Sequence, residues 1–506
     1  MYPMPDADCA SGLLFTQSHE APMPTIFRRS KRIGFAGRNN VTTMKRILVA
    51  NRGEIACRII DAAHGLGMEA IAVYSEADAG AKHCAMADVA VAIGPSPAIK
   101  SYLDMQVVLD AGAQHGADGV HPGYGFLSEN TAFARAAQSR GMQWIGPSVE
   151  SIESMGDKNR ARNIAEACGV PVLPGSIRFA PDDLSQLESE ATRVGFPLLV
   201  KASGGGGGIG MKRVDAMGTL HATVTTTQQL AAKAFGDPGV YLERFVPRAR
   251  HIEIQVFGYG DGTAVHLFER ECSVQRRFQK IVEESPAPHL PAAVLDRMSA
   301  AAVALTASQR YSGAGTVEFI VDADTNEFFF LEMNTRIQVE HGVTEAVTGW
   351  DLVQAQILLA AGRMERVEQD VIQRRGAAIE CRLYAENPAK NFLPSPGKIE
   401  ALTLPVGMNG MRIDTGIRAG DAISPFYDPM IAKLIASGAD RQSALAAMAD
   451  ALAVTRIEGI RHNVAFLSAL IAHPAFVAGH VDTGFVQRES AQLLAASSAV
   501  PAGVAV

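Results

Sequence analysis

The chain has 506 residues, which is too long for a single hydrophobic core and predicts two to four domains. Hydrophobic residues make up 47% of the sequence, so the chain can bury cores and is not expected to be disordered as a whole. A formal net charge of −7 argues against a nucleic-acid-binding protein, and the sequence holds no apolar run of the roughly 18 residues that a membrane span needs.

The cysteines and the N-terminal segment bear on the cellular context. Six cysteines are scattered without any C-x-x-C spacing, which argues against a zinc site or a disulfide framework and fits a reducing cytoplasm. Residues 1–43 are irregular and hold a basic cluster between Arg28 and Arg38. Acidic residues in the same segment argue against a transit peptide, so we expect a disordered extension or an upstream start codon assigned in error.

The globular pattern begins at Met44 with a β-α-β unit. Residues 47–50 predict a strand, residues 55–65 a helix and residues 69–74 the next strand, which together imply a parallel sheet. The turn after the first strand has one glycine, so the dinucleotide-binding fingerprint is missing. A second glycine-containing turn, residues 121–128, also follows a strand. We therefore expect an α/β domain with ligand-facing turns at its strand ends.

A glycine-rich loop is the strongest local signal. Lys201–Met211 reads KASGGGGGIGM and follows the apolar run Phe196–Val200. Backbone N–H groups of a glycine tip between two strands can converge on an anion, and the Lys201 ammonium adds a full charge. A flexible linker is the alternative, but apolar strands rarely flank a linker. Because the Walker motif is absent, the loop predicts phosphate binding of another type.

Polar residues then occupy every second position from Glu332 to Glu340. Successive side chains of an extended chain point to opposite faces, so this row is expected to lie on one side. A solvated strand face is the alternative. The aromatic run Phe328–Phe330 indicates a strand that emerges from a buried core, and this favours a functional site.

The types of residue in and near this row suggest its chemistry. Glu332 and Asn334, together with Glu318, supply the oxygen ligands that magnesium prefers. Arg336 has the planar fork that binds a small oxyanion, and Glu340 is left as a candidate base.

Three weaker patterns remain open on the residues alone. Residues 269–280 mix both charge signs and are equally typical of an exposed charged loop. Tyr241–Val246 resembles a strand edge that could offer backbone groups to an adenine. His251 alternates with apolar residues, as a structural histidine does.

From Met44 to Gln487 the chain closely resembles biotin carboxylase, an ATP-grasp ligase that also forms the first part of acyl-CoA, pyruvate and urea carboxylases. The matching strings are Ala50–Ala56, His121–Asn130, Met155–Lys158, the glycine loop, Glu332–His341, Glu380–Arg382 and Phe392–Lys398. The resemblance implies an α/β (α+β) ATP-grasp fold. Its implied parts are a disordered extension (1–43), an N-terminal parallel-sheet preATP-grasp domain (44–155), an ATP-grasp domain (156–374) with a lid at about 173–246, a C-terminal biotin carboxylase domain (375–490) and a tail (491–506).

The resemblance also implies the reaction and its residues. A cytoplasmic ligase would use ATP and bicarbonate, through carboxyphosphate, to carboxylate N1 of biotin on a carrier protein. Two Mg²⁺ or Mn²⁺ ions would be held by Glu318, Glu332 and Asn334. The implied ATP contacts are Lys158, Lys201, Gly205, Gly206, Gly207, Gly208, Glu243, Arg244, Val246, His251 and Gln275. The implied bicarbonate and biotin residues are Lys280, Arg336, Gln338 and the Val339 backbone for bicarbonate, Glu340 as its base, and Arg382 and Tyr124 for biotin. The implied catalytic set is Lys280, Arg336, Glu340 and Arg382, and Glu340 beside Arg336 should stay ionised near neutral pH.

The sequence departs from the family pattern in three respects. Phe278 replaces the usual histidine, which removes a hydrogen bond expected near the nucleotide. Gly342 replaces a commoner proline and is expected to loosen its turn. Asp61 and Gly65 lie on the first helix where some members carry a charged dimer contact, so the homodimer is an expectation from the family.

The expected partners follow from the resemblance. The chain lacks the Ala-Met-Lys-Met hairpin that carries biotin, so we expect a separate biotin carboxyl carrier protein and carboxyltransferase subunits, and no nucleic acid or membrane partner. Acetyl-CoA is the simplest final acceptor. Alternatives are propionyl-CoA, methylcrotonyl-CoA, pyruvate or urea as acceptor, a catalytically weak interaction subunit, and another ATP-grasp ligase.

Overall fold

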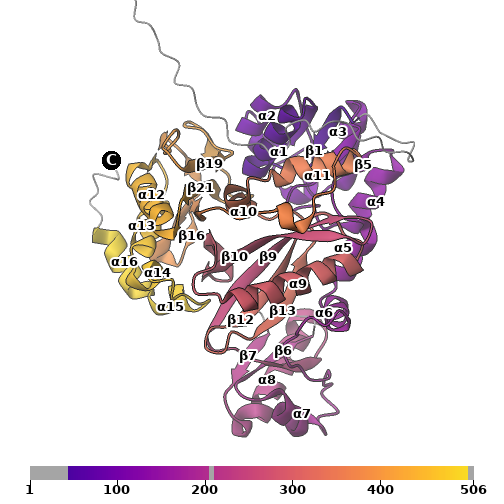
Figure 1. The fold of residues 1–506 in the computed structure, drawn as a ribbon, viewed down its shortest axis with the longest axis vertical. Coiled ribbons are helices and arrows are strands. Elements are labelled where there is room, and N and C mark those ends of the chain that lie inside the picture. Colours follow the sequence, from indigo (N-terminus) through magenta and orange to yellow (C-terminus); the bar gives the residue numbers. More distant parts are fainter. Residues whose placement is uncertain (1–43, 204–209, 500–506) are drawn as a thin grey trace, which may run out of the picture.

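The computed structural model describes residues 44–203 and 210–499, which form a mixed α/β molecule with three main sheets of five, three and eight strands (Figure 1). This class, with a parallel sheet at the N-terminus, confirms the fold predicted from the sequence. The extension 1–43, the loop residues 204–209 with the predicted phosphate contacts Gly205–Gly208, and residues 500–506 lie outside the described part.

The N-terminal unit is a parallel sheet in the order β3-β2-β1-β4-β5. Ile47–Val49 of its central strand are 0% exposed, which explains their continuous apolar run. The first helix begins at Gly53, whose φ of +63° favours glycine. The Asn51 side chain donates to the carbonyls of Pro122 (2.7 Å) and Tyr124 (2.8 Å), so it joins the turns that follow β1 and β4. The elements are β1 (Arg46–Val49), α1 (Gly53–Gly65), β2 (Glu69–Tyr74), α2 (Lys82–Met86), β3 (Val89–Ala92), α3 (Met105–Gln114), β4 (Gly119–His121), α4 (Thr131–Ser139), β5 (Gln143–Trp144) and α5 (Val149–Gly156).

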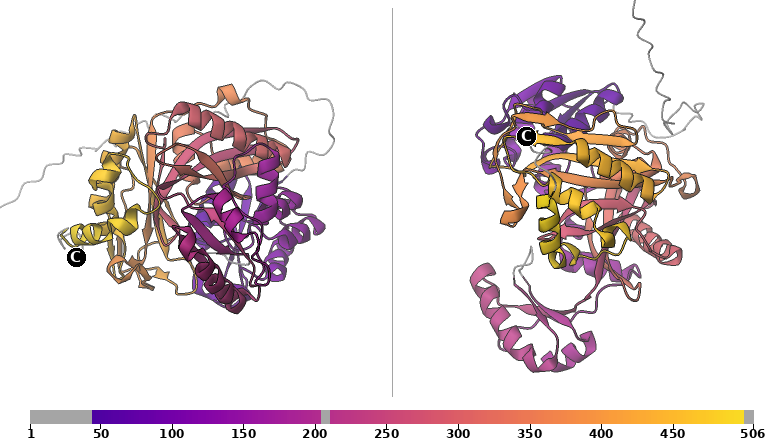
Figure 2. Two further views of the ribbon diagram at one scale, coloured as in Figure 1. Left: turned by 90° about the horizontal axis from the view of Figure 1, so that it is seen from below. Right: turned by 90° about the vertical axis from the view of Figure 1, so that its left-hand side faces the viewer.

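A small lobe carries the strands that flank the glycine loop. Leu198 pairs with Val214 in an antiparallel hairpin, as the sequence predicts, and a third strand completes the sheet. Two helices cover one face of it and bury Leu187 and Val224. The lobe lies at the lower end of the molecule in Figure 1 and projects from the rest in Figure 2 (right). The elements of the lobe and of its entry are α6 (Lys158–Ala167), α7 (Leu187–Val194), β6 (Leu198–Ala202), β7 (Met211–Val214), α8 (Leu220–Phe235) and β8 (Val240–Arg244).

The largest sheet is antiparallel, in the order β13-β12-β9-β10-β11-β14-β21-β19. Val282 of β11 pairs with Cys381 of β14, so the sheet is continuous across residue 375. Helix α9 packs on β9 and β10, and α11 packs on β12. The elements are β9 (Ala249–Tyr259), β10 (Ala264–Arg276), β11 (Gln279–Ser285), α9 (Ala292–Ser308), β12 (Ser312–Asp322), β13 (Phe328–Asn334), α10 (His341–Thr348), α11 (Leu352–Ala360), β14 (Ala377–Tyr384), β19 (Met411–Thr415) and β21 (Met430–Gly438).

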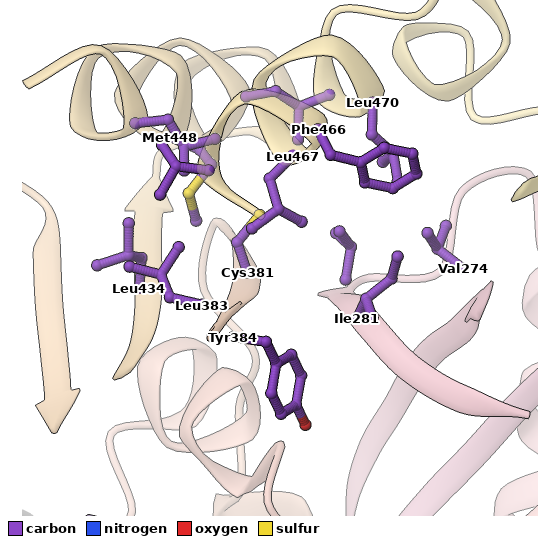
Figure 3. Close-up of a cluster of buried hydrophobic side chains, with 14 of the residues drawn as sticks. Val274, Ile281, Cys381, Leu383, Tyr384, Leu434, Met448, Phe466, Leu467 and Leu470 are labelled. Atoms are coloured by element: carbon purple, nitrogen blue, oxygen red, sulfur yellow. The ribbon is translucent and has the colours of Figure 1, made fainter. Parts of the chain in front are cut away.

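C-terminal helices cover one face of this sheet. Figure 3 shows Met448, Phe466 and Leu467 from these helices packed over Cys381 and Leu434 of the strands. The segment that the sequence analysis assigns to a tail begins with helix α16, whose Leu493 is 1% exposed. The remaining elements are β15 (Glu386–Asn387), β16 (Leu393–Pro394), β17 (Gly397–Lys398), β18 (Ala401–Thr403), β20 (Ala422–Ile423), α12 (Arg441–Val454), β22 (Arg456–Glu458), α13 (Val464–Ile471), α14 (Pro474–Val477), α15 (Phe485–Arg488) and α16 (Ser490–Ala499). Within the described ranges, no helix combines the length and the hydropathy needed to cross a bilayer.

Candidate active site

A cleft of about 980 Å³ lies between the small lobe and the eight-stranded sheet. It brings together residues that are up to 224 positions apart, from Lys158 to Arg382. The predicted site residues on its wall are Lys158, Lys201, Glu243, His251, Gln275, Lys280, Glu318, Glu332, Asn334, Arg336, Gln338, Val339, Glu340 and Arg382.

Three predicted residues are left out of the wall that the described residues form. Arg244 is exposed at the last position of β8, and Val246 is buried at 7% exposure. Tyr124 lies behind the wall, where its hydroxyl donates to the Glu54 carboxylate.

The pairing of β12 with β13 places the predicted metal ligands. Glu318 lies directly opposite Glu332 in this antiparallel pair, and Thr316 lies opposite Asn334. Asn334 Nδ2 donates to Glu318 Oε1 at 2.9 Å. Two carboxylates and an amide oxygen at one sheet edge match the hard oxygen donors of a Mg²⁺ or Mn²⁺ site, so the residues present fit such an ion.

The polar row does not continue as one strand. Strand β13 ends at Asn334, and residues 335–340 form an irregular segment and a turn, so the prediction of an extended chain to residue 340 is wrong. The side chains still reach the cleft because the turn is held by long-range bonds. Arg336 Nε donates to Glu129 (3.0 Å), and Gln338 Nε2 donates to Glu318 (2.8 Å).

Lys280 is the cation at the centre of the cleft floor. Its Nζ lies 2.6 Å from Glu253, 2.9 Å from Glu318 and 2.6 Å from Glu340. Burial alone would lower the pKa of Lys280, but the three carboxylates outweigh it and hold the pKa well above its usual value. The side chain is therefore a permanent positive charge that three carboxylates share.

Glu340 has different partners from the one predicted. Its carboxylate contacts Lys280 and, at 2.9 Å, Arg382 Nη2, whereas Arg336 pairs with Glu129. Burial would raise the pKa of Glu340, but Lys280 and Arg382 outweigh it and hold the pKa well below its usual range. Glu340 is thus ionised at neutral pH, as a base must be, although its cation is not the one that the sequence analysis named.

The nucleotide-side residues form pairs of their own. His251 Nδ1 lies 2.8 Å from Gln275 Nε2, and its Nε2 lies 2.9 Å from Glu318 Oε2. Burial would lower the pKa of His251, but Glu318 outweighs it and raises the pKa. In the lobe, Lys201 donates to Glu243, and at the cleft mouth Lys158 Nζ lies 3.4 Å from Glu332.

Sequence reasoning missed two buried charged residues, Arg270 and Glu253, that contact residues of the cleft wall. Residues 269–280 are not an exposed loop but the hairpin of β10 and β11, and Arg270 is 0% exposed. Its guanidinium donates to Glu253 (2.6 Å) and Gln338 (2.7 Å), so it orders both sides of the floor. Glu253 was detectable, because an acidic residue inside the apolar strand β9 requires a buried partner.

The structure describes the surroundings of two residues that depart from the family pattern, Phe278 and Gly342. Arg277 and Phe278 form the two-residue turn of the hairpin with φ of +49° and +64°, and Phe278 lines the cleft at 76% exposure. Positive φ at both positions is typical of a tight hairpin turn but unusual for a bulky aromatic residue. Gly342 lies in the first turn of helix α10, where an added Cβ would lie 2.5 Å from Ile435 Cδ1, so this position is closely packed.

Comparisons with known proteins agree with this arrangement. Three family models match: "Biotin carboxylase, N-terminal domain" at residues 43–152, "Carbamoyl-phosphate synthase L chain, ATP binding domain" at 157–366, and "Biotin carboxylase C-terminal domain" at 380–488. Biotin carboxylase 1 of Bacillus subtilis is 46% identical over 444 residues, which are 88% of this chain and 98% of that protein. Methylcrotonoyl-CoA carboxylase subunit alpha of Dictyostelium discoideum is also 46% identical, over 90% of this chain and 65% of that protein, so the chain spans less than two thirds of this relative.

Solved structures give the same result. The biotin carboxylase–β-γ-ATP complex from Campylobacter jejuni has a TM-score of 0.82 at 40% identity, and the match covers 88% of this chain and 99% of that chain. The biotin carboxylase domain dimer of Hydrogenobacter thermophilus 2-oxoglutarate carboxylase, in complex with MgADP, ADP and bicarbonate, has a TM-score of 0.82 at 39% identity, over 89% of this chain and 99% of that chain.

Proposed function

The chain belongs to the biotin carboxylase family of ATP-grasp ligases, and from this we propose that it uses ATP and bicarbonate to carboxylate biotin carried by a separate protein. The observation that carries the proposal is the group around Lys280. It joins a candidate metal ligand, Glu318, to a candidate base, Glu340, which in turn contacts the biotin-side Arg382.

The geometry supports a first step between two anions. Glu340 accepts the bicarbonate proton, a bicarbonate oxygen attacks the γ-phosphorus, and ADP leaves. Both reactants are negative, so the step needs fixed cations, which Lys280 and Arg336 supply on the bicarbonate side. Lys158 and Lys201 line the cleft, and in this proposal their ammonium groups hold the triphosphate. Glu318, Glu332 and Asn334 would hold Mg²⁺ or Mn²⁺, which when bound neutralises phosphate charge.

In the second step N1 of biotin loses its proton and takes the carboxyl group of carboxyphosphate, and inorganic phosphate leaves with that proton. Arg382 contacts Glu340 and Glu283, so its guanidinium is fixed at the cleft wall, where it can stabilise negative charge on the biotin carbonyl oxygen. Carboxyphosphate hydrolyses readily, so an enclosed cleft that excludes water favours transfer over loss.

The protein partners and the final carboxyl acceptor are proposed from the relatives alone. The proposal includes a biotin carboxyl carrier protein, carboxyltransferase subunits and a homodimer; the Hydrogenobacter relative is described as a dimer. Acetyl-CoA remains the acceptor that we propose first. Methylcrotonoyl-CoA is the second candidate, because relatives with that name match 88–91% of the chain at 43–46% identity.

The deciding assay measures ADP release with and without bicarbonate and free biotin. We expect ADP release to depend on bicarbonate, to rise on adding biotin, and to stop when EDTA removes the divalent ion. ADP release that is indifferent to both bicarbonate and biotin would reject the assignment.

Phe278 gives a second test of the nucleotide side. The variant Phe278→His is expected to lower the KM for ATP about fivefold, because an imidazole at this cleft position adds one hydrogen bond worth roughly 1 kcal/mol. The control is Phe278→Gly, which fits the same φ but offers no donor. An unchanged KM in the histidine variant, or the same gain in the glycine variant, would show that a lost hydrogen bond is not what distinguishes Phe278.

A further inference from the structure

Lys433 lies behind the cleft wall on β21 and is 0% exposed. Its Nζ donates to the Val339 carbonyl at 2.7 Å and lies 2.9 Å from Glu54 Oε1 and 3.5 Å from Asp414 Oδ2. Burial would lower the pKa of Lys433, but Glu54 outweighs it, with help from Glu380 and Asp414, and raises the pKa. The lysine is therefore charged, and burying this cluster of ions carries a desolvation penalty in the free energy of folding.

The register of the sheet fixes where this charge lies. Asp414 on β19 and Arg382 on β14 are the residues directly opposite Lys433 in the two neighbouring strands. Arg412 also holds Asp414, with bonds of 2.8 and 2.7 Å. Lys433 thus stands in a cross-strand row whose far end, Arg382, is already part of the proposed site.

The first contact of Lys433 acts on the bicarbonate side. The Val339 carbonyl and the Glu340 N–H belong to one planar peptide unit, so a hydrogen bond to this carbonyl fixes the plane from which the Glu340 side chain departs. On the other side of the same turn, Gln338 donates to Glu318. A displaced peptide plane would therefore move the candidate base relative to the candidate metal ligand.

The second contact reaches the biotin side. One oxygen of Glu54 pairs with Lys433, and the other accepts the Tyr124 hydroxyl. The Tyr124 carbonyl is held in turn by Asn51 at 2.8 Å. The Lys433 ammonium group thus contacts the Val339 carbonyl directly, and through the Glu54 carboxylate it is linked to Tyr124, the predicted biotin residue.

Stability alone does not explain this arrangement, because an apolar side chain of similar volume usually serves a buried position at least as well as an ion cluster. Resting on the proposed function, we propose that Lys433 is a positioning residue that holds the Val339–Glu340 peptide and Tyr124 in one fixed arrangement, so that the bicarbonate and biotin sites are aligned.

The test compares Michaelis constants in the full chain. The charge-balanced variant Lys433→Met/Glu54→Gln is expected to raise the KM for bicarbonate and the KM for biotin about tenfold each. The KM for ATP should change less than twofold, since Lys158, Lys201 and His251 make no contact with Lys433. Tyr124→Phe should raise the KM for biotin when it is made in the wild type. Made in the double variant it should cause no further rise, because the proposed coupling between Lys433 and Tyr124 runs through Glu54.

A matched control separates positioning from stability. Arg441→Met removes the arginine that holds Glu284, a buried carboxylate that is not among the residues of the cleft wall. It should lower the melting temperature and leave all three Michaelis constants unchanged. If the Lys433 variant behaves like this control, the proposal is overturned.

Glu54→Gln alone keeps the test decisive if the double variant does not fold. It removes the charge that faces Lys433 and weakens the link to Tyr124, but it leaves the hydrogen bond from Lys433 to the Val339 carbonyl, so it should raise the KM for biotin more than the KM for bicarbonate; equal effects on both would overturn the proposal. Wild-type ADP release that ignores bicarbonate would instead reject the proposed function itself.

Discussion

Replacing Glu340 by glutamine is expected to lower bicarbonate-dependent ADP release by about 10²- to 10⁴-fold, the loss typical of a removed general base. The amide has nearly the same volume, so the cleft keeps its shape. It cannot accept a proton, and its NH₂ group faces the cations Lys280 and Arg382, which now hold the carboxylate at 2.6 and 2.9 Å.

The measurement is kcat/KM for bicarbonate at neutral pH, together with a thermal melt. Glu345→Gln is the matched control, because Glu345 is equally buried, pairs with Arg58 and Arg412, and likewise has a lowered pKa of about 2, but lies outside the cleft wall. A Glu340→Gln variant that keeps more than about a tenth of the wild-type rate would exclude Glu340 as the base.

Local patterns predicted the elements of this fold well. The apolar strand before Asn51 and the helix after it gave the parallel sheet, and the runs on both sides of the glycine loop gave the β6–β7 hairpin. Both are contacts between neighbouring segments of chain. The continuous eight-stranded sheet was beyond such reasoning, because Val282 and Cys381 pair across about 100 residues and no periodicity encodes that partner.

The candidate site shows the same limit at the level of side chains. The row from Glu332 to Glu340 was identified by its alternation, yet β13 ends at Asn334 and the remaining side chains are placed by distant partners. Arg336 is held by Glu129 from the N-terminal unit, and Glu340 by Lys280 and Arg382. Which cation meets which carboxylate depends on tertiary packing, and this is why the predicted partner of Glu340 was wrong.

Lys280→Met is the second substitution with a large expected effect. It removes the cation that Glu253, Glu318 and Glu340 share, so ADP release should fall at least about 100-fold, as for a lost electrostatic group in a water-excluded site. Each carboxylate keeps at least one basic partner: Arg270 for Glu253, His251 for Glu318, and Arg382 for Glu340. The variant should therefore fold, at a cost of about 3–5 kcal/mol in the free energy of unfolding.

The pH dependence distinguishes this mechanism from simple damage. Lys280 is the main cation that lowers the pKa of Glu340, so its removal raises that pKa. A base works only when deprotonated, so the acid limb of the kcat/KM profile should move to higher pH in Lys280→Met and stay in place in Lys280→Arg, which keeps the charge.

The free energy of unfolding should also depend on pH differently in the wild type and in Lys280→Met. In the wild type the lowered pKa of Glu340 contributes stability that is present above the unfolded pKa and is lost as the pH falls through the folded pKa. The variant's folded state binds a proton at a higher pH than the wild type's, so acidification costs it less, and the difference in unfolding free energy between wild type and Lys280→Met should shrink between about pH 5 and about pH 3, where the wild-type Glu340 stays ionised. Urea titrations at the two pH values measure it. A constant difference would mean that Lys280 does not set the protonation of the carboxylates around it, and the electrostatic basis for Glu340 as an ionised base would fail with it.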